Sequence, residues 1–296
     1  MKRRVLLGCF VLCCLAARAG ADRGEIPFES DVKIFEPNQR AMIAWNGSEE
    51  ILLLTTDLHA SRKSKVLEVI PLPNEPKVKQ GDTQAFVRAT ALINMKLDDK
   101  AELTRAEELG GPRPAELPAG EITFHEKIGA HDVNVARVLD PAGFVGWVND
   151  YLKRAGAPNA VIPETLKASV GEYIRDGFTW FVFDVVELDT KPKTNEAIQY
   201  RFKTDALFYP LRISRTGEGQ TLISLMILTP QLLKTFPGLP KGRVQPAHKP
   251  IAITSRELRD LSADMDDLLG HREDMRLRIW DIYGALSSFD KDLIAK

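Results

Sequence analysis

The chain has 296 residues, of which 44% are hydrophobic and 27% charged. This balance is typical of a globular protein and excludes a disordered, fibrous or membrane-embedded chain. The formal net charge of −1 offers no basic surface for a phosphate backbone, so nucleic acid is not expected as a partner.

The first 21 residues have the order of a secretory signal peptide. Basic residues stand at positions 2–4, an apolar run follows at 5–17, and small residues at 19–21 precede an expected cleavage after Ala21. The apolar run is shorter than the roughly 20 residues that a membrane-spanning helix needs. We therefore expect export to the periplasm or the extracellular space, and no transmembrane helix in the mature chain.

Cleavage would change the composition of the protein. All three cysteines, Cys9, Cys13 and Cys14, lie in the segment that is removed, so disulfides, Cys-ligated zinc and a Cys nucleophile are excluded. Loss of four basic residues takes the net charge from −1 to −5. Cys9 sits in a lipoprotein-like box, but only four apolar residues precede it, so lipid anchoring at Cys9 is not expected.

The mature chain opens with a predicted β-hairpin. Apolar stretches at 40–45 and 50–55 flank Asn46-Gly47, a pair that supplies the two positive-φ positions of a type I′ turn. Asn46-Gly47-Ser48 also matches a glycosylation acceptor, but the turn explains the pattern fully.

A strand is predicted at 66–70, and the spaced prolines of 71–76 continue it as an extended segment. Asp82 is placed to cap a helix. The segment 108–120 is rich in proline and glycine, and we interpret it as a loop or as a boundary between two lobes.

Two strands are predicted at 121–126 and 132–138. Pro141 and Pro163 then begin two helices, each with apolar residues at helical spacing. The nearly continuous apolar run 178–186 predicts a strand that is covered on both faces and lies at the centre of the sheet.

The remaining strands are predicted at 197–203, 208–213 and 221–228. The first of these alternates apolar and polar residues, which favours an antiparallel sheet with one solvated face. The segment 235–250 is expected to be irregular.

Thr254 and Glu257 form a capping box at the start of a last helix that extends toward Gly270. The stretch 275–283 fits both a helix and a strand, and a strand is favoured. Together these elements predict an α+β fold, in which a mainly antiparallel sheet is packed by several amphipathic helices. We expect a single domain over 22–296, with two lobes divided near 108–120 as the alternative.

Candidate metal ligands occur at one place in the sequence. His125, His131 and Asp132 flank a turn at Gly129, so their side chains could converge if the turn is tight. The spacing matches no known zinc pattern. No metal or other cofactor is therefore predicted, and these three residues are kept as weak candidates.

Asp184 is unusual because it stands inside the apolar run 178–186. A buried carboxylate needs a partner, and a structural contact with Arg or Lys is favoured over catalysis. No other motif selects catalytic residues: the chain has no Gly-x-Ser-x-Gly, no glycine-rich phosphate loop, and two Ser-x-x-Lys matches without their companion motifs.

The chain resembles a family of exported bacterial proteins, domain of unknown function 2330. The resemblance is carried by EPNQRAMIAWNG at 36–47, EVIPLP at 68–73, YIRDGF at 173–178 and FYPLR at 208–212. The family implies an envelope or secreted location, and it implies no activity, ligand or site residue.

Two hypotheses about function follow. The first is a non-enzymatic binding or structural module of the cell envelope, with a protein or envelope partner, because no catalytic signature is present. The second is a hydrolase or metal-dependent enzyme whose site is built from dispersed His, Asp and Glu residues.

Overall fold

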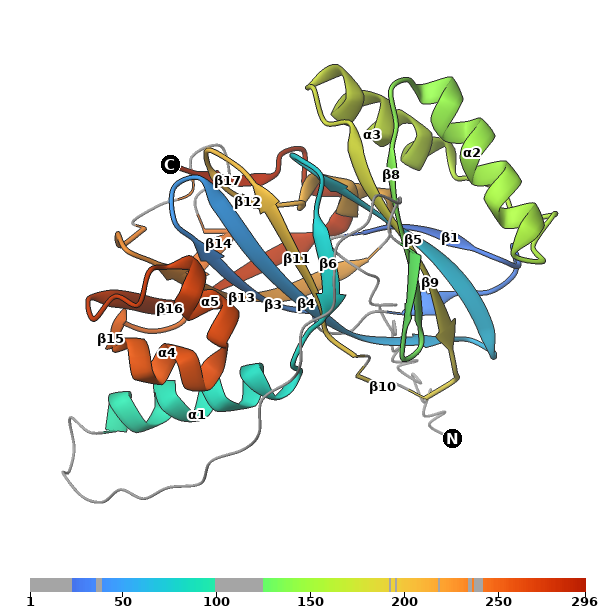
Figure 1. Ribbon diagram of the computed structural model, residues 1–296. Helices are drawn as coiled ribbons and strands as arrows, with labels where there is room; N and C mark the ends of the chain where they lie inside the picture. The colour runs from blue at the N-terminus through green and yellow to red at the C-terminus, as the bar shows by residue number, and fades with distance from the viewer. Residues whose placement is uncertain are drawn as a thin grey trace, which may run out of the picture.

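The computed structural model describes residues 23–35, 39–98, 125–191, 193–194, 196–217, 219–233, 236 and 242–296. These residues form two main β-sheets with helices packed against them (Figure 1). The α+β class is therefore confirmed. The single sheet expected from the sequence is in fact two sheets, because the strands divide between two separate hydrogen-bonded ladders.

The small sheet has five strands, all antiparallel to their neighbours. Their order is β1 (Gly24–Pro27), β5 (Ser64–Leu72), β9 (Trp180–Leu188), β8 (His131–Arg137) and β7 (His125–Ile128). Strand β9 is the apolar run of the sequence, and it lies at the centre of this sheet as expected. All but one of its side chains from Phe181 onward are buried.

Helices α2 (Pro141–Arg154) and α3 (Glu164–Arg175) pack on one face of the small sheet. Helix α2 begins where the sequence predicted: the Asp140 side chain accepts a hydrogen bond from the Gly143 amide at 2.7 Å, and Pro141 occupies the first turn. Phe144, Val148 and Leu152 form its buried stripe.

The large sheet follows the order β14-β16-β13-β3-β4-β11-β6. These strands are β14 (Val244–Pro246), β16 (Met275–Ala285), β13 (Gln220–Thr229), β3 (Gln39–Trp45), β4 (Glu49–Ala60), β11 (Ile198–Lys203) and β6 (Lys77–Gln80). Three short strands pair at its margins: β2 (Ile34–Phe35), β10 (Lys193–Thr194) and β15 (Ile251–Ile253). Among the described strands of this sheet, β3 and β13 run parallel and the other pairs are antiparallel.

The β3–β4 hairpin turns at Asn46-Gly47 as predicted, but the turn is not the predicted type I′, because Asn46 does not have a positive φ. The Asn46 side-chain oxygen accepts hydrogen bonds from the amides of Ser48 and Glu49, at 3.0 and 2.9 Å, and Gly47 has φ +100°. The Asn46 amide nitrogen donates to the Leu268 carbonyl at 3.1 Å. Both ends of the amide are therefore used in fixing the turn.

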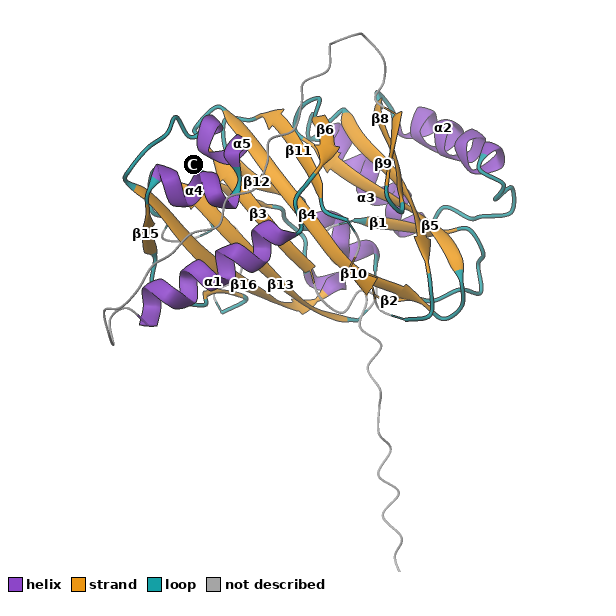
Figure 2. Cartoon of the chain, turned by 60° about the horizontal axis from the view of Figure 1, so that its bottom comes forward, coloured by secondary structure: helices purple, strands orange, loops and turns teal. Residues whose placement is uncertain are grey.

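Helices α1 (Gln84–Asp98), α4 (Ser255–Leu261) and α5 (Ala263–Leu268) cover one face of the large sheet (Figure 2). The last helix of the sequence prediction is two helices. Ser262 is extended at φ −160° and its side chain accepts from the Met265 amide, so it ends α4 and caps α5. The Thr254–Glu257 capping box is present as expected.

The two sheets share a core. Ile70, Val135 and Val182 of the small sheet belong to the same buried cluster as Leu52 and Tyr200 of the large sheet. The two-stranded pair β12 (Leu207–Tyr209) and β17 (Leu293–Ala295) also contributes to this cluster. Hydrophobic contact between the sheets is therefore continuous.

A polar junction joins α3 to the end of the chain. The Tyr173 hydroxyl donates to Asp292 at 2.5 Å, and the Arg212 amide donates to the same carboxyl oxygen at 2.8 Å. The Arg212 guanidinium stacks 4.0 Å from the centre of the Tyr173 ring. Burial raises the pKa of Asp292 to about 6, although these hydrogen bonds oppose the rise.

Three further expectations are settled by the structure. The strand predicted at 208–213 ends at Tyr209, and residues Arg212–Thr216 form a 3₁₀ helix, η1. Part of the irregular segment 235–250 is strand β14, and the ambiguous stretch 275–283 is strand β16.

The boundary expected at 108–120 lies outside the described residues. Among the described helices, none has the length and apolar character needed to cross a membrane.

Candidate functional site

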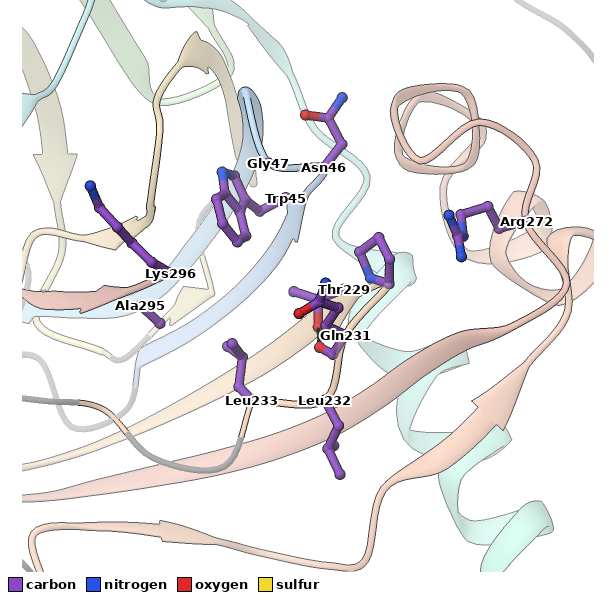
Figure 3. Close-up of a pocket in the computed structure, with 11 residues that line it drawn as sticks. Trp45, Asn46, Gly47, Thr229, Gln231, Leu232, Leu233, Arg272, Ala295 and Lys296 are labelled. Carbon is purple, nitrogen blue, oxygen red and sulfur yellow. Dashed lines mark hydrogen bonds between the residues drawn. The ribbon is translucent and has the colours of Figure 1, made fainter.

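A hollow of about 600 Å³ lies at one end of the large sheet (Figure 3). Its position follows from the topology: β3 and β13 are parallel, so their carboxyl ends meet at the same edge and bring Trp45 beside Thr229. The chain enters the antiparallel β16 at this edge, which places Arg272 nearby. Ala295 and Lys296 at the end of the chain complete the lining, and we call this hollow the Trp45 pocket.

The Trp45 ring is held in place. Its indole nitrogen donates to the Thr204 carbonyl at 3.3 Å, and the half-buried ring packs against the shared core. Leu232 and Leu233 add aliphatic surface beside it, and Leu232 is 41% exposed. The lining of the pocket thus includes a fixed aromatic ring and two leucines, which suit the body of a small ligand.

Two cations stand at the margins of the pocket. In Figure 3, Trp45 is seen between Lys296 on one side and Thr229 and Arg272 on the other. The Arg272 guanidinium makes two hydrogen bonds to Asp274, at 2.8 and 2.7 Å. Lys296 contacts Asp205 at 2.9 Å and thereby lowers the pKa of that carboxyl.

These ion pairs are exposed. The Arg272 and Lys296 side chains are 45% and 70% exposed, and surface pairs of this kind contribute only about 0–1 kcal/mol each. An anionic ligand can therefore replace the aspartates at little cost. Among the described residues that line the pocket, none carries a carboxyl, imidazole or thiol side chain. The geometry suits the binding of a small ligand that carries negative charge.

A second group of polar residues lies inside the small sheet, on the face toward the shared core. Glu68 on β5 is the register partner of Asp184 on β9, and His131 lies two residues before Val133, the partner of Asp184 on β8. Glu68 and Asp184 are fully buried, and His131 is 1% exposed. Arg23, which is 3% exposed, forms a salt bridge with Glu68.

His131 and Asp184 are directly paired, with 2.6 Å between Nδ1 and Oδ2. Burial opposes protonation of the imidazole, but the hydrogen bond to Asp184 and the charges of Asp184 and Glu68 outweigh it and raise the pKa of His131. We call Arg23, Glu68, His131 and Asp184 the buried charge network. Arg23 balances the charge of Glu68 in this water-poor interior, and His131 forms a hydrogen bond with Asp184.

Comparison with known families decides the relationship of the chain. A family model for an uncharacterized protein conserved in bacteria, DUF2330, matches residues 18–269. The chain belongs to the DUF2330 family. This confirms the resemblance noted in the sequence. No curated protein matches the chain.

Two solved structures show a distant similarity to this DUF2330 protein. A crystal structure of baculovirus P35 aligns with a TM-score of 0.47 and 8% identity, over 92% of this chain and 99% of that chain. A mutated baculovirus P35 after caspase cleavage aligns with a TM-score of 0.40 and 8% identity, over 88% and 98% of the two chains. These similarities are too low to assign a function.

The three weak metal candidates of the DUF2330 chain are not brought together as a set. His131 turns toward Asp184 and Glu68, whereas Asp132, its neighbour on β8, is opposite in the strand alternation and lies near Asn134. His125 is in β7, where its backbone pairs with Asn134; its side chain lies outside the described residues. The strand period therefore separates Asp132 from His131.

Asp184 needed a partner, and its direct partner is a histidine. The sequence favoured Arg or Lys; the arginine of the network, Arg23, instead pairs with the neighbouring Glu68. The contact with His131 spans 53 residues of sequence, so only the strand pairing of the fold could have indicated it.

Asp266, on α5, has a structural role. Buried Asp266 accepts hydrogen bonds from Ser255, from Arg259 and from His271, with the last at 2.7 Å. These contacts tie α4 to α5 and to the turn at His271, which has φ +53°. Asp266 is therefore a structural residue of this helix pair.

The Trp45 pocket was not found from the sequence. Asn46-Gly47 correctly located the turn next to Trp45, but nothing in the sequence indicated that β13 would pair in parallel with β3. That pairing, across about 180 residues of chain, is what brings Thr229 and Leu232 to Trp45.

Proposed function

We propose that this DUF2330 protein is an exported, non-enzymatic binding module of the cell envelope, and that its ligand occupies the Trp45 pocket. The observation that carries the proposal is a hollow of about 600 Å³ lined by a fixed aromatic ring and two replaceable cations. A volume of roughly 300–1,000 Å³ is usual for sites that hold small molecules. Export is supported by the signal-like residues 1–21.

The pocket chemistry defines a ligand class. The ring of Trp45 and the leucines favour a flat apolar body, and Arg272 and Lys296 favour negative charge. We therefore propose a small carboxylate-bearing ring compound as the ligand. Its carboxylate takes over the hydrogen bonds that Arg272 gives to Asp274 or the contact that Lys296 makes with Asp205.

The alternative function, a hydrolase or metal-dependent enzyme built on dispersed His, Asp and Glu, has weaker support. The described residues do bring His131, Asp184 and Glu68 together, but their exposed fractions are 0–1%. The hollows at the surface are lined by other residues. A substrate would not reach these side chains in this conformation, so we do not adopt the enzymatic alternative.

A ligand screen with matched compounds tests the proposal. Aromatic and alicyclic carboxylates are compared with their uncharged amides by thermal shift, because a ligand that binds only the native state raises the melting temperature. Carboxylates that raise the melting temperature are then titrated by calorimetry. We expect the carboxylate of a pair to bind and its amide to bind at least about tenfold more weakly, a difference of about 1.4 kcal/mol.

Variants assign the binding to the pocket. Trp45→Leu removes the ring and is expected to abolish the thermal shift, whereas Trp147→Leu removes a tryptophan from α2 and leaves the shift unchanged. The affinity of Arg272→Gln for the carboxylate is compared with that of Lys153→Gln, which removes an exposed cation on α2. If the amides bind as well as the carboxylates, or if Trp45→Leu leaves the affinity unchanged, the proposal is wrong.

A further inference from the structure

Three carboxylates stand in one row across the small sheet. Glu25 on β1 is the register partner of Glu68 on β5, and Glu68 is the partner of Asp184 on β9. Residues that are partners in antiparallel strands point to the same face. Like charges placed opposite one another destabilise a sheet unless cations compensate them. Arg23 pairs with Glu68 in this row and is the permanent cation of the buried charge network.

The network also contains atoms that could coordinate a metal ion. One atom from each of Glu68, His131 and Asp184 lies within 4.8 Å of the other two. His131 Nε2 and Asp184 Oδ1 are buried and make no hydrogen bond to any described residue. In the neutral form of His131 that carries its proton on Nδ1, Nε2 keeps a lone pair. Buried polar atoms without partners are rare and call for an explanation.

A surface hollow lies beside Arg23. Arg23 and Glu25 line a hollow of about 280 Å³ between β1 and the start of α3, where Pro163 also contributes. Arg23 therefore separates the hollow from Glu68, its salt-bridge partner. A rotation of the Arg23 side chain toward the hollow would open the three ligands to solvent and remove the cation that competes with a metal.

From this geometry we infer that Glu68, His131 and Asp184 form a site for a divalent transition-metal ion, and that Arg23 occupies its place when no ion is bound. One imidazole and two carboxylates suit ions such as Zn²⁺ or Mn²⁺. The ion supplies the charge that Arg23 otherwise contributes. Ligands at about 2.1 Å from one ion lie at most about 4.2 Å apart, and the three ligand atoms already lie within 4.8 Å of one another.

A second group with the same residue types provides the internal control. Asp266, Asp267 and His271 also lie close enough to hold an ion, but Arg259 donates two hydrogen bonds to Asp266 and Ser255 donates a third. Asp267 and His271 are exposed there. The hydrogen bonds of that group already join α4 to α5, and we assign no metal to it.

Metal binding is measured on the purified protein after treatment with EDTA. Equilibrium dialysis with ZnCl₂ or MnCl₂ gives the stoichiometry, and CoCl₂ gives a visible spectrum that reports nitrogen and oxygen ligands. We expect one ion per chain. His131→Gln and Asp184→Asn are each expected to weaken binding by at least the roughly 10–100-fold that loss of an outer-shell partner costs. Arg23→Gln is expected to tighten it.

The control variant is His271→Gln, which leaves binding unchanged if the small sheet holds the ion. Retained binding in His131→Gln together with loss in His271→Gln would overturn the inference, as would a wild-type protein that takes up no ion. If circular dichroism shows that His131→Gln is unfolded, Arg23→Gln decides: binding that is not tighter than wild type contradicts the proposal. Ligand binding at the Trp45 pocket, measured in EDTA, is independent of all these outcomes.

Discussion

The buried charge network of the small sheet and the Trp45 pocket of the large sheet both combine arginine or lysine with acids, but in opposite surroundings. In the network, the charged groups are 0–3% exposed. At the pocket, Arg272 and Lys296 are 45% and 70% exposed. The same pairing of charges therefore fixes the fold in one region and leaves cations ready for a ligand in the other.

The largest effect is expected where a buried charge loses its partner. Asp184→Ala leaves His131 protonated or unpaired beside Glu68 and is expected to lower the free energy of unfolding by about 3–5 kcal/mol. Urea denaturation of the wild type and the variant, at neutral pH and in EDTA, measures this difference in the free energy of unfolding. A loss of less than about 1 kcal/mol would mean that the network behaves like a surface ion pair. It would contradict the difference drawn between the network and the Trp45 pocket.

A matched double variant separates packing from charge. Replacing His131 and Asp184 together by leucine removes both charges, and a well-packed apolar pair can be neutral relative to a buried ion pair. We expect the double variant to be more stable than Asp184→Ala. The reverse order would show that volume, and not an unpaired charge, dominates the cost.

The next effect depends on pH and concerns Asp292 at the junction with α3. Its pKa is raised to about 6 in the folded protein from 3.8. The folded state thus binds the proton more tightly, and the stabilisation is fully present below about pH 3.8 and is lost as the pH rises through 6. The difference corresponds to about 3 kcal/mol. Asp292→Asn should remove this loss of stability with rising pH.

Stability measured from pH 4 to pH 7 in the wild type and in Asp292→Asn checks the sign. The wild-type curve is expected to fall relative to the variant across this range. A difference between the two curves that does not change with pH would show that Asp292 titrates as an exposed carboxyl and that the junction is solvated.

The smallest effect is expected at the pocket margin. Arg272→Gln and Lys296→Gln each break an exposed ion pair and should change the free energy of unfolding by less than about 1 kcal/mol. Thermal denaturation measures the change. A larger loss would mean that these side chains support the fold, and it would weaken their assignment as cations that a ligand can recruit.

The sequence predicted local structure well where local chemistry determines it. The turn at Asn46-Gly47, the capping of α2 by Asp140 and the capping box at Thr254 depend on side chains a few residues apart. The break at Ser262 was missed because a serine at that position fits a helix surface as well as a cap.

Sites built from distant residues were harder to predict. Asp184 was correctly singled out as a buried carboxylate, but its partner His131 is fixed by the pairing of β8 with β9. His131 had been grouped with Asp132, its neighbour in sequence, and the two-residue period of the strand directs the two apart. The parallel pairing of β3 with β13, on which the Trp45 pocket depends, left no pattern in either strand alone.

The most direct test uses the indole N–H signals in a ¹H–¹⁵N NMR spectrum. The chain has four tryptophans, and Trp45→Leu identifies the signal of Trp45. On addition of a carboxylate that raises the melting temperature, we predict that the Trp45 signal moves while those of Trp147, Trp180 and Trp280 stay in place. Movement of another indole signal with Trp45 unchanged would contradict binding at the Trp45 pocket.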